Sequence, residues 1–234
     1  LFVLNGKDGK LIHSMKVPDG AETYCSNLSW NRDGEQLVVF GTGGETFPGS
    51  LWSVPLKSVT EGTLKDAREL VPPTDSKGAV APPSFADLDR DGVLDLIAVP
   101  FDGRVVVISG RTQSTLWQYT PAGVHETQSS PAIADMDGDG DLDIAYVTQV
   151  GVFPRWTASH VRVFDGLSGE VLWEEQIEGN LSAASPLALD IDGDQRCELF
   201  YIDANPALFR PSMKERSISN LQFVHVDEKR KVDL

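Results

Sequence analysis

Several features of well-known protein classes are missing from this chain of 234 residues. No run approaches the roughly 20 apolar residues that a membrane-spanning helix needs. Two cysteines, Cys25 and Cys197, are too few for a disulfide-rich scaffold or a cysteine-based zinc cluster. The four histidines are scattered, and no Gly-x-Ser-x-Gly motif is present. These absences give no support to hydrolase or zinc chemistry.

Positive charge is also scarce. Lys and Arg number 20 against 35 Asp and Glu, which gives a formal net charge of −15. A chain with this balance repels nucleic acids and anionic membrane surfaces, so neither is an expected partner. The negative charge is unevenly spread, because thirteen carboxylates lie in three short stretches of nine residues each.

The three acidic stretches, 87–95, 135–143 and 190–198, share one spacing. Each has an acidic residue at its first, third, fifth and ninth positions. Four carboxylates so close together repel one another unless a cation lies among them, and Ca²⁺ takes six to eight oxygen ligands. We therefore expect about three Ca²⁺ ions, with a backbone carbonyl at the seventh position completing each set. The predicted ligands are Asp87, Asp89, Asp91, Val93 and Asp95; Asp135, Asp137, Asp139, Asp141 and Asp143; and Asp190, Asp192, Asp194, Arg196 and Glu198.

An EF-hand begins in a similar way but requires a Glu at position twelve and a helix on each side. Position twelve is occupied here by Ala98, Tyr146 and Tyr201. Each stretch leads into a short β-rich apolar run, such as Ile144-Ala-Tyr-Val147, and so into a strand. The EF-hand interpretation is therefore excluded.

The acidic stretches alternate with a second repeated unit. This unit is a hairpin with glycine in its turn, as in Val161–Trp173 and Val105–Trp117. The first residues of successive acidic stretches are 48 and 55 residues apart. Four antiparallel strands in a period of this size are typical of a β-propeller blade, so the fold class is all-β with about four blades. The expected divisions are 1–18 (end of a preceding blade), 19–71 (a blade whose loop is degenerate), 72–120, 121–178 and 179–234 (incomplete).

These residues carry a resemblance to known families. Asp-x-Asp-x-Asp-Gly-x-x-Asp at 87–95 and 135–143 resembles the calcium loop of FG-GAP (VCBS-type) repeats, as in integrin α-subunit propellers. The hairpin Asp165–Trp173 is similar to the quinoprotein-like propeller repeat. The resemblance implies that the aspartates of both loops bind metal. The third loop departs from it at Gln195 and Glu198. We expect the chain to be a piece of a larger propeller with seven or eight blades.

Long connections should gather on the face opposite the acidic loops and form a binding surface there. They contain aromatic and arginine residues of the kinds that dominate protein interfaces. The candidates for partner binding are Phe47, Phe153, Arg155, Trp156, Phe209 and Arg210. The alternative is that these tips pack against neighbouring blades.

The sequence thus predicts a non-enzymatic, calcium-stabilised β-propeller that binds proteins or glycans in adhesion. Calcium loops of this kind stay filled where free Ca²⁺ is millimolar, which favours an extracellular, cell-surface or periplasmic location. The alternatives are a polysaccharide lyase or a quinoprotein-like enzyme on a calcium-bearing propeller, and an intracellular scaffold.

Overall fold

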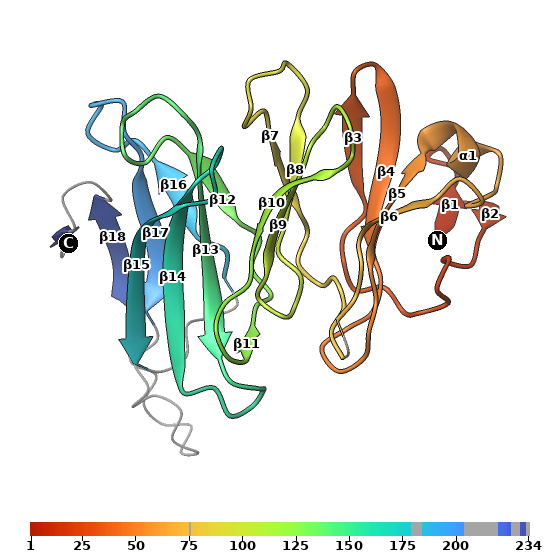
Figure 1. The fold of residues 1–234 in the computed structure, drawn as a ribbon. Coiled ribbons are helices and arrows are strands. Elements are labelled where there is room, and N and C mark those ends of the chain that lie inside the picture. Colours follow the sequence, from red (N-terminus) through yellow and green to blue (C-terminus); the bar gives the residue numbers. More distant parts are fainter. Residues whose placement is uncertain (75, 179–183, 204–219, 226–229, 233–234) are drawn as a thin grey trace.

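The computed structural model describes residues 1–74, 76–178, 184–203, 220–225 and 230–232. They form four antiparallel sheets, preceded by a hairpin (Figure 1). Three of the sheets have four strands, and the third sheet has a short fifth strand. The hairpin is β1 (Phe2–Leu4) and β2 (Leu11–Ser14). The first sheet holds β3 (Leu28–Arg32), β4 (Glu35–Gly41), β5 (Leu51–Pro55) and β6 (Arg68–Val71), with the helix α1 (Leu56–Thr60) between its last two strands. The second holds β7 (Ser84–Ala86), β8 (Asp95–Ala98), β9 (Val105–Ile108) and β10 (Thr115–Tyr119). The third holds β12 (Ala132–Ala134), β13 (Asp143–Val150), β14 (Ala158–Asp165) and β15 (Val171–Glu178), and the short β11 (His125–Glu126) pairs with the far end of β13. The fourth holds β16 (Leu187–Leu189), β17 (Glu198–Asp203), β18 (Asn220–His225) and β19 (Arg230–Val232).

Each four-stranded sheet is a meander in which every strand pairs with the next one in the sequence. The sheets follow one another across the molecule from the N-terminal hairpin to β18, face against face (Figure 1). This is the arrangement of β-propeller blades. The predicted fold class, an all-β propeller with about four blades in this chain, is confirmed.

The middle strands are buried on both faces. All four residues of β8 and of β9 are buried, because each sheet packs between two neighbours. Such strands read as continuous apolar runs, and Val105-Val-Val-Ile108 is one. A proline stands immediately before the first strand of the last three sheets, at Pro83, Pro131 and Pro186.

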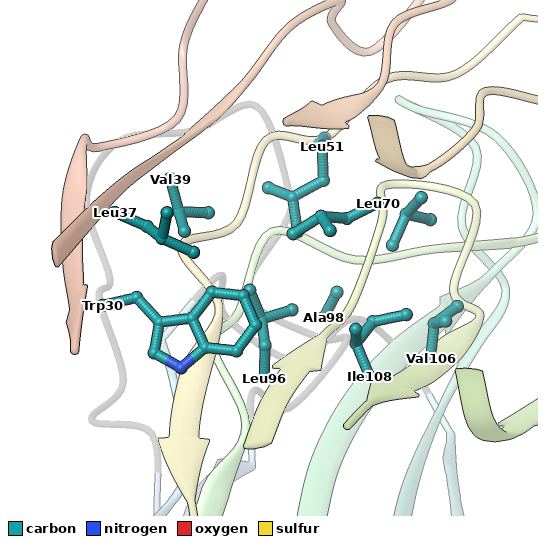
Figure 2. Close-up of a cluster of buried hydrophobic side chains, with 11 residues drawn as sticks. Trp30, Leu37, Val39, Leu51, Leu70, Leu96, Ala98, Val106 and Ile108 are labelled. Carbon is teal, nitrogen blue, oxygen red and sulfur yellow. The ribbon is translucent and has the colours of Figure 1, made fainter. Parts of the chain in front are cut away.

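Hydrophobic clusters fill the spaces between sheets. Figure 2 shows the cluster between the first and second sheets, where Trp30 from β3 lies beside Leu96 from β8. The Trp30 indole N–H also donates to the carbonyl of Leu94 at 2.7 Å. In the same way, Trp117 of the second sheet donates to the carbonyl of Gly166 in the third at 2.8 Å. These tryptophans therefore join successive blades.

Two features of the fold differ from the expected divisions. The segment 179–234 was expected to be incomplete, yet its sheet has four strands. Its last strand, β19, has only three residues and no strong apolar pattern, which explains why the sequence did not reveal it. The helix α1, five residues long, was also not expected. Residues 1–18 form only a hairpin, which packs on the first sheet through Val3 and Met15.

Candidate metal sites and the opposite face

The three acidic stretches connect the first and second strands of the last three sheets. They are the β7–β8, β12–β13 and β16–β17 loops, and they lie at the same edge of the molecule, the top in Figure 1. The equivalent connection of the first sheet is a two-residue turn, Asp33-Gly34, between β3 and β4. Equivalent placement follows from the meander, because every first strand enters its sheet in the same direction.

The backbone of each acidic loop has a left-handed residue at the fourth and sixth positions. These φ angles are 58° at Arg90 and 83° at Gly92, 83° at Gly138 and 88° at Gly140, and 83° at Gly193 and 76° at Gln195. Gly193 therefore serves the fourth position and does not replace the missing glycine at the sixth. Gln195 itself takes a conformation that glycine adopts at no steric cost, so the third loop is the most strained of the three at that position.

In the first two loops the carboxylates of positions one, three and nine converge. One oxygen each from Asp87, Asp89 and Asp95 lies within 4.8 Å of the others, and the same holds for Asp135, Asp137 and Asp143. Ca²⁺ binds oxygens at about 2.3–2.6 Å, so ligands on opposite sides of one ion are about 5 Å apart. The residues present fit a calcium ion in both loops.

The ninth-position carboxylates are the most buried of the set. Asp95 is 0% exposed and Asp143 is 1% exposed. Each accepts a backbone N–H from the second position of its own loop, Leu88 at 2.9 Å and Met136 at 2.8 Å. Burial raises the pKa of the Asp95 carboxyl, and burial together with the charges of Asp137 and Asp139 raises the pKa of Asp143 to about 7. A bound cation would offset this cost of keeping buried carboxylates ionised.

The other predicted ligands of the first two loops do not belong to the converging groups of carboxylates. The fifth-position side chains Asp91 and Asp139 accept the backbone N–H of the seventh position, at 2.9 and 2.7 Å, and stand outside the converging groups. Their coordination, and that of the carbonyls of Val93, Asp141 and Arg196, stays a prediction.

In the third loop a different set converges, namely Asp190, Asp192 and Asp194 at positions one, three and five. Glu198 accepts the N–H of Ile191 at 2.9 Å, as Asp95 and Asp143 do in their loops. The longer Glu side chain thus keeps the structural role of the ninth position.

Arginines link the loops to one another, which the spacing of the acidic residues did not reveal. Arg90 of the first loop forms an ion pair with Asp141 and donates to the carbonyl of Gly140 in the second. Arg111, in the β9–β10 turn, donates to the carboxylate of Asp91 at 2.6 Å and to its carbonyl at 2.7 Å. The side chain of Arg111 lowers the pKa of Asp91 through this hydrogen bond. Charge at this edge is therefore partly balanced by the protein itself.

On the opposite face, one buried carboxylate organises the connection between β13 and β14. Glu126 is 1% exposed, and one of its oxygens accepts both the backbone N–H of Phe153 and the indole N–H of Trp156, each at 2.8 Å. Its other oxygen accepts from Lys77 at 2.6 Å. Phe153 and Trp156 lie edge to face with ring centroids 5.2 Å apart. These contacts tie the connection to the sheet and leave Phe153 and Arg155 exposed and Trp156 half-buried.

Of the remaining candidates for partner binding, one lies among the described residues and two do not. Phe47 is half-buried beside Tyr24, with ring centroids 6.3 Å apart, and both line a pocket of about 290 Å³. Glu45 in the same connection accepts the side-chain amide of Gln128 at 3.0 Å, which ties this connection to the third blade. Phe209 and Arg210 lie outside the described residues.

A buried polar network inside the third blade was also not foreseen. His125 contacts Thr148 at 3.0 Å, and Thr148 accepts from Arg162 at 3.2 Å. Arg162 in turn contacts His160 at 2.8 Å and Glu174 at 3.0 Å. Burial lowers the pKa of His125, and the charge of Arg162 lowers it further. The only sequence signal for this network is the alternation of polar residues along β13 and β14, which places them on one face of the sheet.

The fold and the loops define a β-propeller segment with three acidic loops, each of which brings together three carboxylates that could hold a metal ion. Comparison with known proteins agrees over part of the chain, because residues 87–146 match the model of the FG-GAP-like repeat. Those residues cover the first two acidic loops, as the resemblance of the motifs implied.

No curated protein matches the sequence. Among solved structures, the chain is similar to the crystal structure of BamB from Moraxella catarrhalis, with 11% identity and a TM-score of 0.47. The similarity covers 95% of this chain and 55% of that structure, so the chain spans about half the length of this structural neighbour.

The described residues include no helix with the length and apolar character needed to cross a membrane.

Proposed function

We propose that this chain is a calcium-stabilised, non-enzymatic propeller module that works outside the cytosol and binds a protein or glycan partner. The observation that carries the proposal is the convergence of buried and half-buried carboxylates in two loops at one edge, in the part of the chain that matches the FG-GAP-like repeat. Bound Ca²⁺ would neutralise these oxygens. The chain's own residues hold the loops in shape through backbone N–H groups donated to Asp87, Asp135 and Asp190.

The calcium part of the proposal predicts a stoichiometry. Equilibrium dialysis against millimolar Ca²⁺ should give about three ions per chain, one for each acidic loop. The double variant Asp137→Asn, Asp143→Asn should lose one ion and keep the others. Retention of all ions by this variant, or no bound Ca²⁺ in the unaltered chain, would contradict the assignment.

Partner binding is proposed on the face opposite the calcium loops. The connection held by Glu126 presents Phe153 and Arg155 to solvent in a fixed conformation, which lowers the entropy cost of binding. The chain, labelled with a fluorescent dye, is applied to a glycan array and to mammalian and bacterial cells. We expect binding that depends on this connection. Phe153→Ala and Arg155→Ala should weaken binding with little change in melting temperature, because both side chains are exposed. Leu116→Ala on β10, also exposed, is the matched control.

An extracellular location follows from the same proposal, since weak calcium loops fill only where Ca²⁺ is millimolar. The chain would work as part of a larger propeller, whose further blades would cover the end faces of the stack.

A further inference from the structure

The outer face of the fourth sheet carries a strip of exposed leucine and isoleucine side chains. Leu187 is 58% exposed, Leu189 52% and Ile191 49%. Leu187 and Leu189 lie on one side of β16 because side chains alternate along a strand, while Ala188 between them packs into the cluster shared with the third sheet. Three large apolar side chains in one strip are costly to leave in water, so the strip needs a covering surface.

The internal repeat identifies what covers such a strip. Leu189 pairs with Glu198, as Ala134 pairs with Asp143 in the preceding blade. Ile191 is the second residue of its loop, as Met136 is. Ala134 is only 8% exposed and Met136 only 1%, because both pack against the second strand of the next blade. By register, the strip on β16 occupies the position that faces a following blade.

The three complete blade interfaces show a size rule at this position. Trp30, Ala86 and Ala134 are equivalent residues of the first strands, because they pair with Leu37, Asp95 and Asp143 of their own second strands. On the next blade, the residue three places after the corresponding second-strand position is Ala98, Tyr146 or Tyr201, and it lies in the cluster between the two blades. Large Trp30 shares its cluster with small Ala98, whereas small Ala86 and Ala134 share theirs with Tyr146 and Tyr201. Figure 2 shows Trp30, Leu96 and Ala98 in the first of these clusters. At this pair of positions a large residue on one blade shares its cluster with a small one on the next, which is compatible with close packing.

We propose that Leu187, Leu189 and Ile191 form the docking face for a further four-stranded blade from outside residues 1–234, with a small residue such as Ala facing Leu189. This inference rests on the proposed membership in a larger propeller, but it needs no bound calcium. The blade would bury the strip as the fourth sheet buries Ala134 and Met136.

A second copy of this chain does not supply the required surface. The equivalent surface on the first sheet is the side of β4 that holds Phe40, and Phe40 is 1% exposed under Val3 and Met15 of the N-terminal hairpin. Phe40 is also large, so it would clash with Leu189 under the size rule. The partner must therefore present a free second strand with a small side chain.

Cysteine labelling tests the proposal. In a background with Cys25→Ala and Cys197→Ala, Leu189→Cys is compared with Leu167→Cys, which lies in the β14–β15 turn at 54% exposure. In the chain 1–234 both thiols should react with iodoacetamide at similar rates. In the whole natural gene product, Leu189→Cys should react at least tenfold more slowly and Leu167→Cys should be unchanged.

Equal rates at the two positions in the whole gene product would overturn the proposal. Protection of Leu189→Cys in the chain 1–234 itself, appearing at high concentration and lost on dilution, would assign the face to a second copy and also overturn it. A protein that binds no calcium yet protects this position would refute the calcium proposal and leave this one standing.

Discussion

The buried carboxylate of Asp143 should destabilise the folded chain when no metal is bound and stabilise it when Ca²⁺ is bound. Its pKa of about 7 reflects burial and the neighbouring charges of Asp137 and Asp139. Without a cation the ionised form is therefore unfavourable, whereas with Ca²⁺ present the same charge is a ligand.

We predict that Asp143→Asn crosses over in stability with calcium. In EGTA the variant should be at least as stable as the unaltered chain, because it removes a buried charge and keeps an oxygen for the N–H of Met136. In Ca²⁺ at about 100 times the dissociation constant it should be less stable by about 2–3 kcal/mol, the contribution of one site. Thermal and urea unfolding in EGTA and in Ca²⁺ measure the two stability differences. Asp33→Asn, in the exposed turn of the first sheet, is the control and should change little in either condition. A variant that is equally destabilised with and without Ca²⁺ would contradict the prediction.

His125 gives a pH dependence that is separate from the calcium loops. Its pKa in the folded chain is lowered by burial and by the facing charge of Arg162, with a smaller contribution from His160, while Glu174 acts in the opposite direction. The unfolded chain has the ordinary pKa of about 6.5. As the pH falls below that value the unfolded state takes up a proton first, so stability is lost on acidification.

The expected result is a steeper loss of stability between pH 7 and pH 5 in the unaltered chain than in His125→Gln, with both measured in millimolar Ca²⁺. Gln can still hydrogen-bond Thr148 but does not titrate. Parallel pH profiles for the two proteins would show that His125 is not held in its neutral form.

At the scale of the element, the backbone of each acidic loop is determined by its own sequence, whereas the charge of its carboxylates also depends on nearby arginines. In the first loop Arg111 occupies the carboxylate of Asp91, while the fifth-position Asp139 of the second loop has no arginine contact among the described hydrogen bonds and ion pairs. An arginine on a ligand carboxylate competes with a cation for the same oxygens. The first loop should therefore bind Ca²⁺ more weakly than the second.

Replacement of Arg111 by Gln should raise the Ca²⁺ affinity of the first loop several-fold. The change is best measured by calorimetry in a background where the second loop carries Asp137→Asn and the third loop carries Asp192→Asn, so that binding to these loops does not overlap with binding to the first. Arg68→Gln, which removes an exposed arginine bonded to Gln113 in the same turn, is the matched control. An unchanged or lower affinity in Arg111→Gln would show that this arginine supports the site and does not compete with the ion.

The acidic loops could be predicted from sequence because their carboxylates are close together in the chain. All the carboxylates of a site lie within nine residues, so their spacing alone indicates the chemistry, and the apolar runs after them indicate strands. The link from Arg90 to Asp141 and the contact of Lys77 with Glu126 join residues about fifty positions apart. Such pairs depend on how blades are stacked, which no local pattern encodes. The second role of Trp156, as a donor to Glu126, was hidden for the same reason.

At the scale of the whole molecule, the sheets pack through a series of apolar interfaces, and at one pair of positions in each interface a large residue shares a cluster with a small one. The repeat of about fifty residues was enough to predict the blades, because four short strands with glycine turns recur. The residue that faces each blade was not predictable, because it varies from Trp30 to Ala134 and makes sense only beside its partner on the next blade.

The size rule predicts the outcome of a double-mutant cycle. Ala134→Leu should destabilise the chain by about 1–3 kcal/mol, because the added volume meets Tyr201. Tyr201→Ala should destabilise it by leaving a cavity. The double variant should be more stable than the sum of the two effects implies, since Leu would fill the space that Tyr201 leaves. Additive effects in urea unfolding would show that these residues do not pack against each other.

The most direct test of the whole account is thermal unfolding of the unaltered chain in millimolar Ca²⁺ and in EGTA, with the bound metal counted in parallel. We predict a large rise in melting temperature with Ca²⁺, fully reversed by EGTA, and about three ions per chain. A melting temperature that is the same in both conditions, with no bound ion, would contradict the account and leave the acidic loops as solvated turns of the propeller.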